Sequence, residues 1–289
     1  MAVRPGSRTR ARVLAVADGQ RRTRSDYLAT EEPLEVRLVA GGATATVAVT
    51  MRTPGADFEL AVGFLHGEGV IGGRGDVARI SYCTDPQVDA EQQYNIVNVA
   101  LTAGALPDLH ALERHFMTSS ACGVCGKASL DALELRGCPV LPPGPALDPA
   151  VLPRLPVALR ERQGLFESTG GLHAAGLFTA DGELVAVRED VGRHNAVDKL
   201  VGWALLDARL PLHRHVLMVS GRSSYEILQK ALAAGIPVVC AVSAPSSLAV
   251  DLARRFGVTL VGFLRGERFN VYAGEERLGL PAASLRTGR

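Results

Sequence analysis

The chain has 289 residues, enough for one large domain or two ordinary ones, and 47% of them are hydrophobic, which suffices to bury a core. The formal net charge of +1 gives no overall attraction to nucleic acid or to an anionic membrane, and apolar runs stay shorter than the roughly 20 residues that span a bilayer. We therefore expect neither a nucleic-acid nor a membrane partner.

The N-terminal half contains two predicted regions. Residues 1–24 are polar and rich in arginine, and we predict a flexible arm there. Residues 25–117 predict a small α+β unit, because period-two alternation and helical periodicity both occur in it. Its predicted elements are a hairpin with strands over 34–39 and 44–49, a helix capped by Asp57, and strands over 77–83 and 94–101.

Residues 118–150 are predicted to form a cysteine loop followed by a proline-rich connector. Cys122 and Cys125 lie three residues apart in a run of small and hydroxyl side chains, so the loop should be exposed. Lys127 and the backbone N–H groups near Gly123 and Gly126 would favour the thiolate, which is the reactive form of cysteine. Such a pair can collect sulfur, exchange disulfides or hold a metal.

Two zinc sites are alternatives to a reactive thiol pair. A structural zinc needs four ligands, and Cys138 with His110 or His115 would have to complete the set. A zinc deaminase needs His-x-Glu and Pro-Cys-x-x-Cys; residues 66–68 match the first motif, but Ala121 stands where the proline belongs. Because no second Cys-x-x-Cys and no His-x-x-x-His pair occurs, we predict no metal. A zinc-stabilised binding module and a hydrolytic deaminase are the alternative functions.

The cysteine content also indicates the compartment. The cysteines are odd in number and widely spaced, which is typical of the reducing cytoplasm and not of a secreted disulfide framework. The five are Cys83, Cys122, Cys125, Cys138 and Cys240.

Residues 151–289 predict a C-terminal α/β domain. Continuously apolar strands separated by single amphipathic helices indicate a parallel sheet covered on both faces. The predicted elements are strands over 175–179, 184–187, 215–220, 236–242 and 258–263, and helices over 195–206, 225–234 and 247–256.

Three polar turns follow the predicted parallel strands. Because ligands bind at the carboxyl edge of open α/β sheets, and helix N-termini attract anions, we predict a phosphate-bearing ligand there. Plain serine capping is the alternative for the first two turns, and a solvated turn for the third. The first turn contains Gly221, Arg222, Ser223 and Ser224, the second spans 243–247, and the third contains Phe263, Leu264, Arg265, Gly266, Glu267 and Arg268.

A fourth polar segment, 189–195, also lies between a strand and a helix. Arg193 could clamp an anion, and His194 could serve as acid, base or phosphate contact. His173 lies in a glycine-rich turn and is a weaker candidate.

Together these segments resemble the FdhD family of formate dehydrogenase accessory sulfurtransferases. The resemblance is carried by 120–126, 189–199 and 220–226, with shorter matches at 64–69 and 263–266. It implies a sulfur carrier that takes persulfide sulfur from a cysteine desulfurase. The carrier then passes it to the molybdenum or tungsten bis-molybdopterin guanine dinucleotide cofactor of formate dehydrogenase.

The resemblance also implies roles for residues and an architecture. Cys122 would be the persulfide carrier, and Phe263–Arg268 would bind the cofactor. Beside this resemblance, we predict that Cys125 is a second catalytic thiol, which either relays the sulfur or attacks Cys122 to release it. The expected fold is α/β, with a smaller α+β N-terminal unit and a cytidine-deaminase-like three-layer C-terminal domain that lacks the deaminase zinc. A homodimer is expected.

Overall fold

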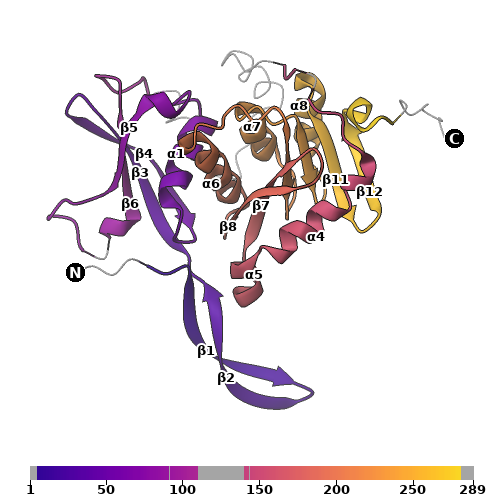
Figure 1. The fold of residues 1–289 in the computed structure, drawn as a ribbon. Coiled ribbons are helices and arrows are strands. Elements are labelled where there is room, and N and C mark those ends of the chain that lie inside the picture. The colour runs from indigo at the N-terminus through magenta and orange to yellow at the C-terminus, as the bar shows by residue number, and fades with distance from the viewer. Residues whose placement is uncertain (1–4, 91, 110–139, 143, 281–289) are drawn as a thin grey trace. The chain divides into compact units, whose positions relative to one another are not determined.

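The computed structural model describes residues 5–90, 92–109, 140–142 and 144–280 (Figure 1). Cys122 and Cys125 lie outside these residues. The chain divides into two compact units that take alternate stretches of the sequence. Unit 1 consists of Met1–Cys122, Gln163–His173 and Arg188–Ala208, and unit 2 of Gly123–Arg162, Ala174–Val187 and Arg209–Arg289.

This partition differs from the predicted single C-terminal domain over 151–289, because residues 163–173 and 188–208 belong to unit 1. The main cause is α6 (Arg193–Leu206), which packs against α1 (Asp57–Gly67). Sequence periodicity shows that a helix has an apolar face, but it does not show which distant helix covers that face.

The sheet of unit 1 has the strand order β4-β3-β6-β5 (Figure 1). β3 pairs antiparallel with β4 and parallel with β6, and β5 pairs antiparallel with β6. Alternate residues Leu34, Val36 and Leu38 of β3 are buried, as period two requires for a strand with one face in the core. The predicted strands are confirmed as β3 (Glu32–Ala40), β4 (Ala43–Arg52), β5 (Val77–Tyr82) and β6 (Ile96–Leu101).

Glycines allow α1 and α6 to approach closely. A Cβ atom on Gly63 would lie 1.8 Å from the carbonyl oxygen of Asp198, and one on Gly202 would lie 1.8 Å from that of Glu59. A side chain at either position would therefore collide with the backbone of the other helix.

Most of the segment predicted as a flexible arm forms a strand pair. β1 (Arg8–Ala17) and β2 (Gln20–Ala29) pair antiparallel across a turn at Asp18 and Gly19. Both turn residues have positive φ, 49° and 76°, as Asp-Gly does in two-residue hairpin turns. The two strands were not predicted because most side chains on both faces are exposed, so no apolar face marked them. α5 (Gly164–Thr169) contacts β2.

The sheet of unit 2 has the strand order β12-β11-β10-β9-β7-β8. β9, β10 and β11 are parallel, as predicted, whereas β7 and β12 run antiparallel to their neighbours. The sheet is therefore mixed. Its strands are β7 (His173–Thr179), β8 (Leu184–Asp190), β9 (His215–Val219), β10 (Val238–Ala241), β11 (Thr259–Arg265) and β12 (Arg268–Ala273).

Helices cover both faces of this sheet (Figure 1). α4 (Arg154–Glu161) contributes Leu155 and Leu159 to a buried cluster that includes Val216 and Met218 of β9. Because side chains alternate along a strand, Leu217 and Val219 point to the other face. The crossover helices α7 (Tyr225–Ala233) and α8 (Ser247–Phe256) lie on that face and contact each other.

Short 3-10 turns occupy Arg74–Asp76, Gln93–Asn95, Pro149–Val151 and Glu275–Leu278. Each helix in the described part of the chain is too short or too polar to cross a membrane.

Candidate functional site

The turns after β9 and β10 are hydrogen-bonded to each other in unit 2. The N–H of Ser223 donates to the carbonyl of Ala244 at 3.3 Å, and the N–H of Ser246 donates to the carbonyl of Ser223 at 2.9 Å. A parallel bridge between Ser223 and Pro245 completes the contact. The first two predicted turns therefore meet at one edge of the sheet, as the strand order at their carboxyl ends requires.

The two turns supply the N-termini of α7 and α8. Ser224 and Ser246 are the N-cap residues, and the hydroxyl of Ser246 accepts a hydrogen bond from the N–H of Ala249 at 3.2 Å. For Ser246 the capping interpretation is therefore confirmed. Each helix end also presents the positive pole of its backbone dipole to this edge.

Ser223 and Arg222 have different surroundings. Ser223 is fully buried, and its hydroxyl has no hydrogen-bond partner among the described residues. A buried hydroxyl without a partner costs about 1–3 kcal/mol, and a water molecule or a ligand can satisfy such a group. Arg222 is exposed beside it and can reach an anion at the same edge.

The third predicted turn, at the end of β11, joins the same edge. The N–H of Phe263 donates to the carbonyl of Ser243 at 3.2 Å, and Nε of Arg265 donates to the carbonyl of Val242 at 3.2 Å. Phe263 has φ 53°, a conformation that non-glycine residues adopt rarely and at a cost of about 1–3 kcal/mol. The residue is 43% exposed, so an aromatic side chain is held at the edge.

Not every residue of the third turn faces solvent. Leu264 is fully buried in the core cluster of unit 2, so its side chain supports the edge and, unlike the other predicted side chains of this turn, is not exposed at it. Alternation along β11 buries Leu264 because its neighbours point outward. Gly266 has φ 52° in the turn to β12, where left-handed backbone favours glycine. Arg265, Glu267 and Arg268 are exposed.

The edge as a whole brings together groups that suit a phosphate-bearing ligand. It combines two helix N-termini, the exposed cations Arg222, Arg265 and Arg268, and the aromatic ring of Phe263. Guanidinium groups and helix N-termini both bind phosphate oxygens, and an aromatic face can stack on a purine. Exposure of the arginines also fits the solvated-turn interpretation, so a binding measurement has to decide between them.

The segment 189–195 lies in unit 1 and is mostly structural. Asp190 and Lys199 form a buried ion pair of 2.7 Å. The carboxylate of Asp190 also accepts hydrogen bonds from the N–H groups of Thr53 and Gly192 and from the side-chain amide of Asn195. The carboxylate of Glu189 accepts the N–H groups of Leu165 and Phe166 at the start of α5.

Arg193 and His194 remain candidates for binding. Both are half-buried in the first turn of α6, and the buried Nε of Arg193 has no hydrogen-bond partner among the described residues. Burial lowers the pKa of the nearby His173, and the positive charges of Arg193 and His194 lower it further. These three side chains belong to unit 1, whereas the edge described above belongs to unit 2.

A buried polar network around Arg52 was not predicted. Arg52 is fully buried and donates to the carboxylate of Asp57 at 3.1 Å and to the side-chain oxygen of Asn95 at 3.0 Å. The hydroxyl of Tyr82 donates to the other oxygen of Asp57 at 2.9 Å. We predicted that Asp57 caps α1, but the N-cap residue is Ala56 and Asp57 is the first residue of the helix. The carboxylate of Asp57 binds Arg52 instead. A lone arginine after an apolar strand gave no sign of this network in the sequence.

The described cysteines are poor nucleophiles. Cys83 and Cys240 are both buried, and burial raises the pKa of the Cys240 thiol to about 12. The remaining cysteines, and His110 and His115 of the structural zinc alternative, lie outside the described residues, whereas His66 of the deaminase alternative lies at the end of α1. Within the described ranges, no three His, Cys, Asp or Glu side chains are placed to hold a metal ion.

Comparison with known proteins finds similarity along almost the whole chain. Residues 29–279 match the model of the FdhD/NarQ family. The chain is 55% identical over 280 residues to the sulfur carrier protein FdhD of Streptomyces avermitilis, covering 96% of this chain and 98% of the relative. It is 52% identical over 264 residues to the protein of the same name from Mycobacterium tuberculosis, covering 89% and 93% of the two chains.

A solved structure is similar as well. It is the crystal structure of a protein described as a formate dehydrogenase accessory protein, from Desulfotalea psychrophila. The TM-score is 0.70 at 26% sequence identity, and the match covers 94% of this chain and 99% of that one.

Proposed function

The chain belongs to the FdhD/NarQ family, and on this premise we propose that it carries sulfur for the maturation of formate dehydrogenase. In this proposal it accepts sulfur from a cysteine desulfurase as a persulfide and transfers it to the molybdenum cofactor, a bis-molybdopterin guanine dinucleotide. The observation that carries the proposal is 55% identity, over 96% of the chain, to a protein named sulfur carrier protein FdhD. The accessory role named for the similar structure supports the same pathway of maturation.

The proposed loading step is a thiol–persulfide exchange at Cys122. Its thiolate attacks the terminal sulfur of the donor persulfide; the donor S–S bond breaks, a new S–S bond forms on Cys122, and the donor leaves as a thiolate. Burial of Cys83 and Cys240 supports placing the carrier among the other cysteines, since a carrier must meet two partners.

The proposed release step leaves two roles open for Cys125. Either the terminal sulfur passes to Cys125 and then to the metal, or the Cys125 thiolate attacks the inner sulfur of the Cys122 persulfide. The second route expels hydrosulfide and leaves a Cys122–Cys125 disulfide, so atoms and charge balance.

The edge of the unit 2 sheet is the proposed site for the dinucleotide part of the cofactor. The phosphates would meet Arg222, Arg265 and Arg268 at the N-termini of α7 and α8, and Phe263 offers an aromatic face to a guanine. Arg193 and His194 are proposed as further contacts. A cytidine-deaminase-like architecture of the C-terminal half, a homodimer and a cytoplasmic location stay expectations that come from the resemblance and the cysteine content.

Persulfide loading tests the proposal. The protein is incubated with a cysteine desulfurase and cysteine, and its peptides are analysed by mass spectrometry under non-reducing conditions. We expect a mass increase of one sulfur atom on the Cys122 peptide, lost in Cys122→Ala but kept in the matched control Cys138→Ala.

In cells, Cys122→Ala should lower formate dehydrogenase activity to the level seen without the protein. Persulfide on another residue, or full activity of Cys122→Ala, excludes sulfur delivery by Cys122. Zinc analysis of the same sample tests the metal-bound alternatives.

A further inference from the structure

The β1–β2 hairpin has two different faces. In an antiparallel pair, residues directly opposite each other lie on the same face. The register pairs Arg12 with Ser25 and Val16 with Arg21, which fixes the members of each face. One face, here called the arginine face, carries Arg8, Arg10, Arg12, Leu14, Val16, Arg21, Thr23, Ser25 and Tyr27. The opposite face carries Arg22, Arg24, Asp26 and Leu28, with small apolar residues.

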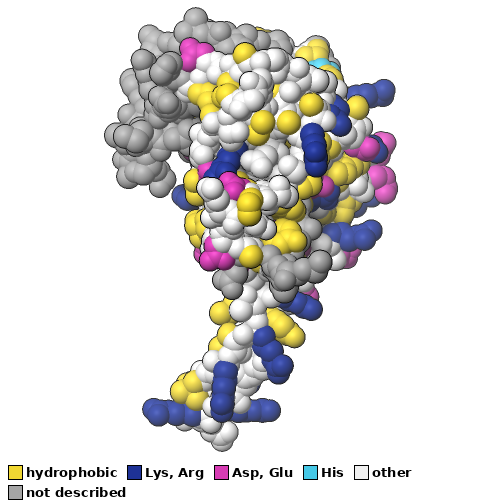
Figure 2. Space-filling model, turned by 90° about the vertical axis from the view of Figure 1, so that its left-hand side faces the viewer, with side chains coloured by type: hydrophobic (Ala, Val, Ile, Leu, Met, Phe, Trp, Pro, Cys, Tyr) yellow, Lys and Arg dark blue, Asp and Glu magenta, His cyan; other side chains and the backbone are white. Residues whose placement is uncertain are grey.

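The arginine face is strongly cationic. The hairpin contains six arginines and two aspartates, a net charge of +4 on a chain whose total is +1. Neither aspartate belongs to the arginine face, because Asp18 lies in the turn and Asp26 pairs with Arg24 on the opposite face at 3.2 Å. Figure 2 shows the basic side chains projecting along the hairpin. Within the described residues, no carboxylate forms an ion pair with Arg8, Arg10, Arg12 or Arg21.

The same face exposes large apolar side chains. Leu14 is 59% exposed, Val16 63% and Tyr27 42%. A two-stranded hairpin with so little burial is marginally stable alone, and an exposed apolar patch commonly marks an interaction site. A surface that combines arginine, tyrosine and aliphatic side chains has the composition of a protein interface.

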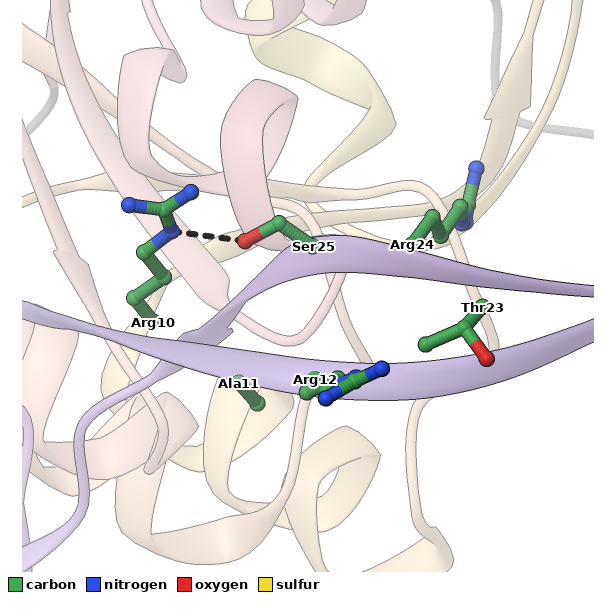
Figure 3. A pocket seen from close by; sticks show the side chains of 6 residues that line it. All are labelled: Arg10, Ala11, Arg12, Thr23, Arg24 and Ser25. Atoms are coloured by element: carbon green, nitrogen blue, oxygen red, sulfur yellow. Dashed lines mark hydrogen bonds between the residues drawn. The ribbon is translucent and has the colours of Figure 1, made fainter.

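Contacts within the hairpin hold parts of this face in place. The guanidinium of Arg8 lies over the ring of Tyr27, 4.7 Å from its centre. Nε of Arg10 donates to the hydroxyl of Ser25 at 2.7 Å, across a shallow hollow lined also by Arg12 and Thr23 (Figure 3). Side chains that are already ordered lose less entropy on binding, so this face is prepared for a partner.

We propose that the arginine face docks onto an acidic surface patch with an apolar patch beside it on the client formate dehydrogenase. The inference rests on the proposed function, because that function supplies the client. The charge of the face favours an acidic partner, and Leu14 and Val16, in the two rows nearest the turn, favour apolar contact at that end. Most of the hairpin precedes residue 29, where the match to the family model begins, but the match to the Streptomyces avermitilis relative covers 96% of the chain and so includes part of the hairpin.

Paired charge reversals on the two faces test the docking. Binding of the purified full-length protein to the formate dehydrogenase of the same organism is measured by biolayer interferometry at low and at physiological salt. Arg12→Glu with Arg21→Glu changes the arginine face, and Arg22→Glu with Arg24→Glu makes the same charge change on the opposite face. We expect the first pair to weaken binding roughly tenfold or more and the second less than about threefold. Binding of the unaltered protein should weaken as salt rises.

Several results overturn the inference. The first is that the unaltered protein does not bind the dehydrogenase, and the second is that both double variants lose the same amount of binding. The third is that the first double variant no longer self-associates. The fourth is that the unaltered protein binds a DNA duplex and the first double variant does not. Sulfur loading by the desulfurase is measured on the same samples. If the unaltered protein loads no sulfur, the proposed function fails. If both double variants load sulfur normally and both bind the dehydrogenase like the unaltered protein, the docking inference fails alone. Circular dichroism confirms that the variants are folded.

Discussion

Asp190 and Lys199 are almost completely buried and lie 2.7 Å apart. Their charges are tolerated because the Asp190 carboxylate also accepts three hydrogen bonds, and the Lys199 ammonium donates to the carbonyl of Thr53 at 2.8 Å. Removing one partner of such a pair costs about 3–5 kcal/mol, since an uncompensated charge stays in the interior. The pair therefore fixes the backbone from which the half-buried Arg193 and His194 project.

Thiol labelling provides a test at the scale of single residues. Because the pKa of Cys240 is raised to about 12, only about one molecule in ten thousand carries its thiolate at pH 8. We expect iodoacetamide at pH 8 to leave Cys240 unlabelled in the native protein and to label it after denaturation in guanidinium, as read by peptide mass spectrometry. Labelling of Cys240 at the rate of a free thiol under native conditions would contradict the burial described here.

At the scale of elements, the sequence predicted the helices and strands whose apolar side chains repeat with a regular period. The alternation in 34–39 and 44–49 gave β3 and β4, and the strand–helix alternation gave β9 to β11 with α7 and α8. It missed β1 and β2, whose side chains are mostly exposed on both faces, so the Asp-Gly turn had to be recognised without an apolar stripe. It also missed α4, α5 and β12.

The contact between α1 and α6 depends on two glycines. Alanine at position 63 or 202 would place a methyl group 1.8 Å from a carbonyl oxygen, so the helices must separate. We expect Gly63→Ala and Gly202→Ala each to lower the free energy of unfolding by about 3 kcal/mol, near the upper end for overpacking. The control is Gly75→Ala, where nothing lies within 4 Å of the added Cβ and the change should stay within about 0.5 kcal/mol. Urea denaturation measures all three, and a Gly63→Ala protein as stable as the control would refute the close approach.

At the scale of the whole molecule, the sequence located the edge of the unit 2 sheet but not its details. Strand–turn–helix order was enough to bring 220–224, 243–247 and 263–268 together, because parallel strands end at the same edge. It was not enough to show that Leu264 points into the core or that Arg52 is fully buried. Those facts depend on strand register and on contacts between residues distant in the chain, which a single sequence does not contain.

Acid should weaken both units through two half-buried histidines. Burial is the first cause of the lowered pKa of His173 in unit 1 and of His215 in unit 2, with Arg193 and Arg209 as the next causes. In the unfolded chain both imidazoles titrate near the ordinary pKa of 6.5. Below that pH the unfolded state therefore binds more protons than the folded state. Their contribution to stability is therefore complete above about pH 6.5 and is lost as the pH falls toward the lowered, folded-state pKa values.

Urea denaturation between pH 8 and pH 5.5 measures this loss, in a range where most carboxylates stay ionised. We expect the free energy of unfolding to fall by less than about 1.4 kcal/mol per pH unit for each histidine, because one proton sets the upper limit and partial exposure reduces it. His173→Asn and His215→Asn should each flatten the pH dependence, and the double variant should flatten it most. Their effect at pH 8 gives the cost of the substitution itself and serves as the baseline. A double variant that keeps the full slope would assign the acid sensitivity to other groups.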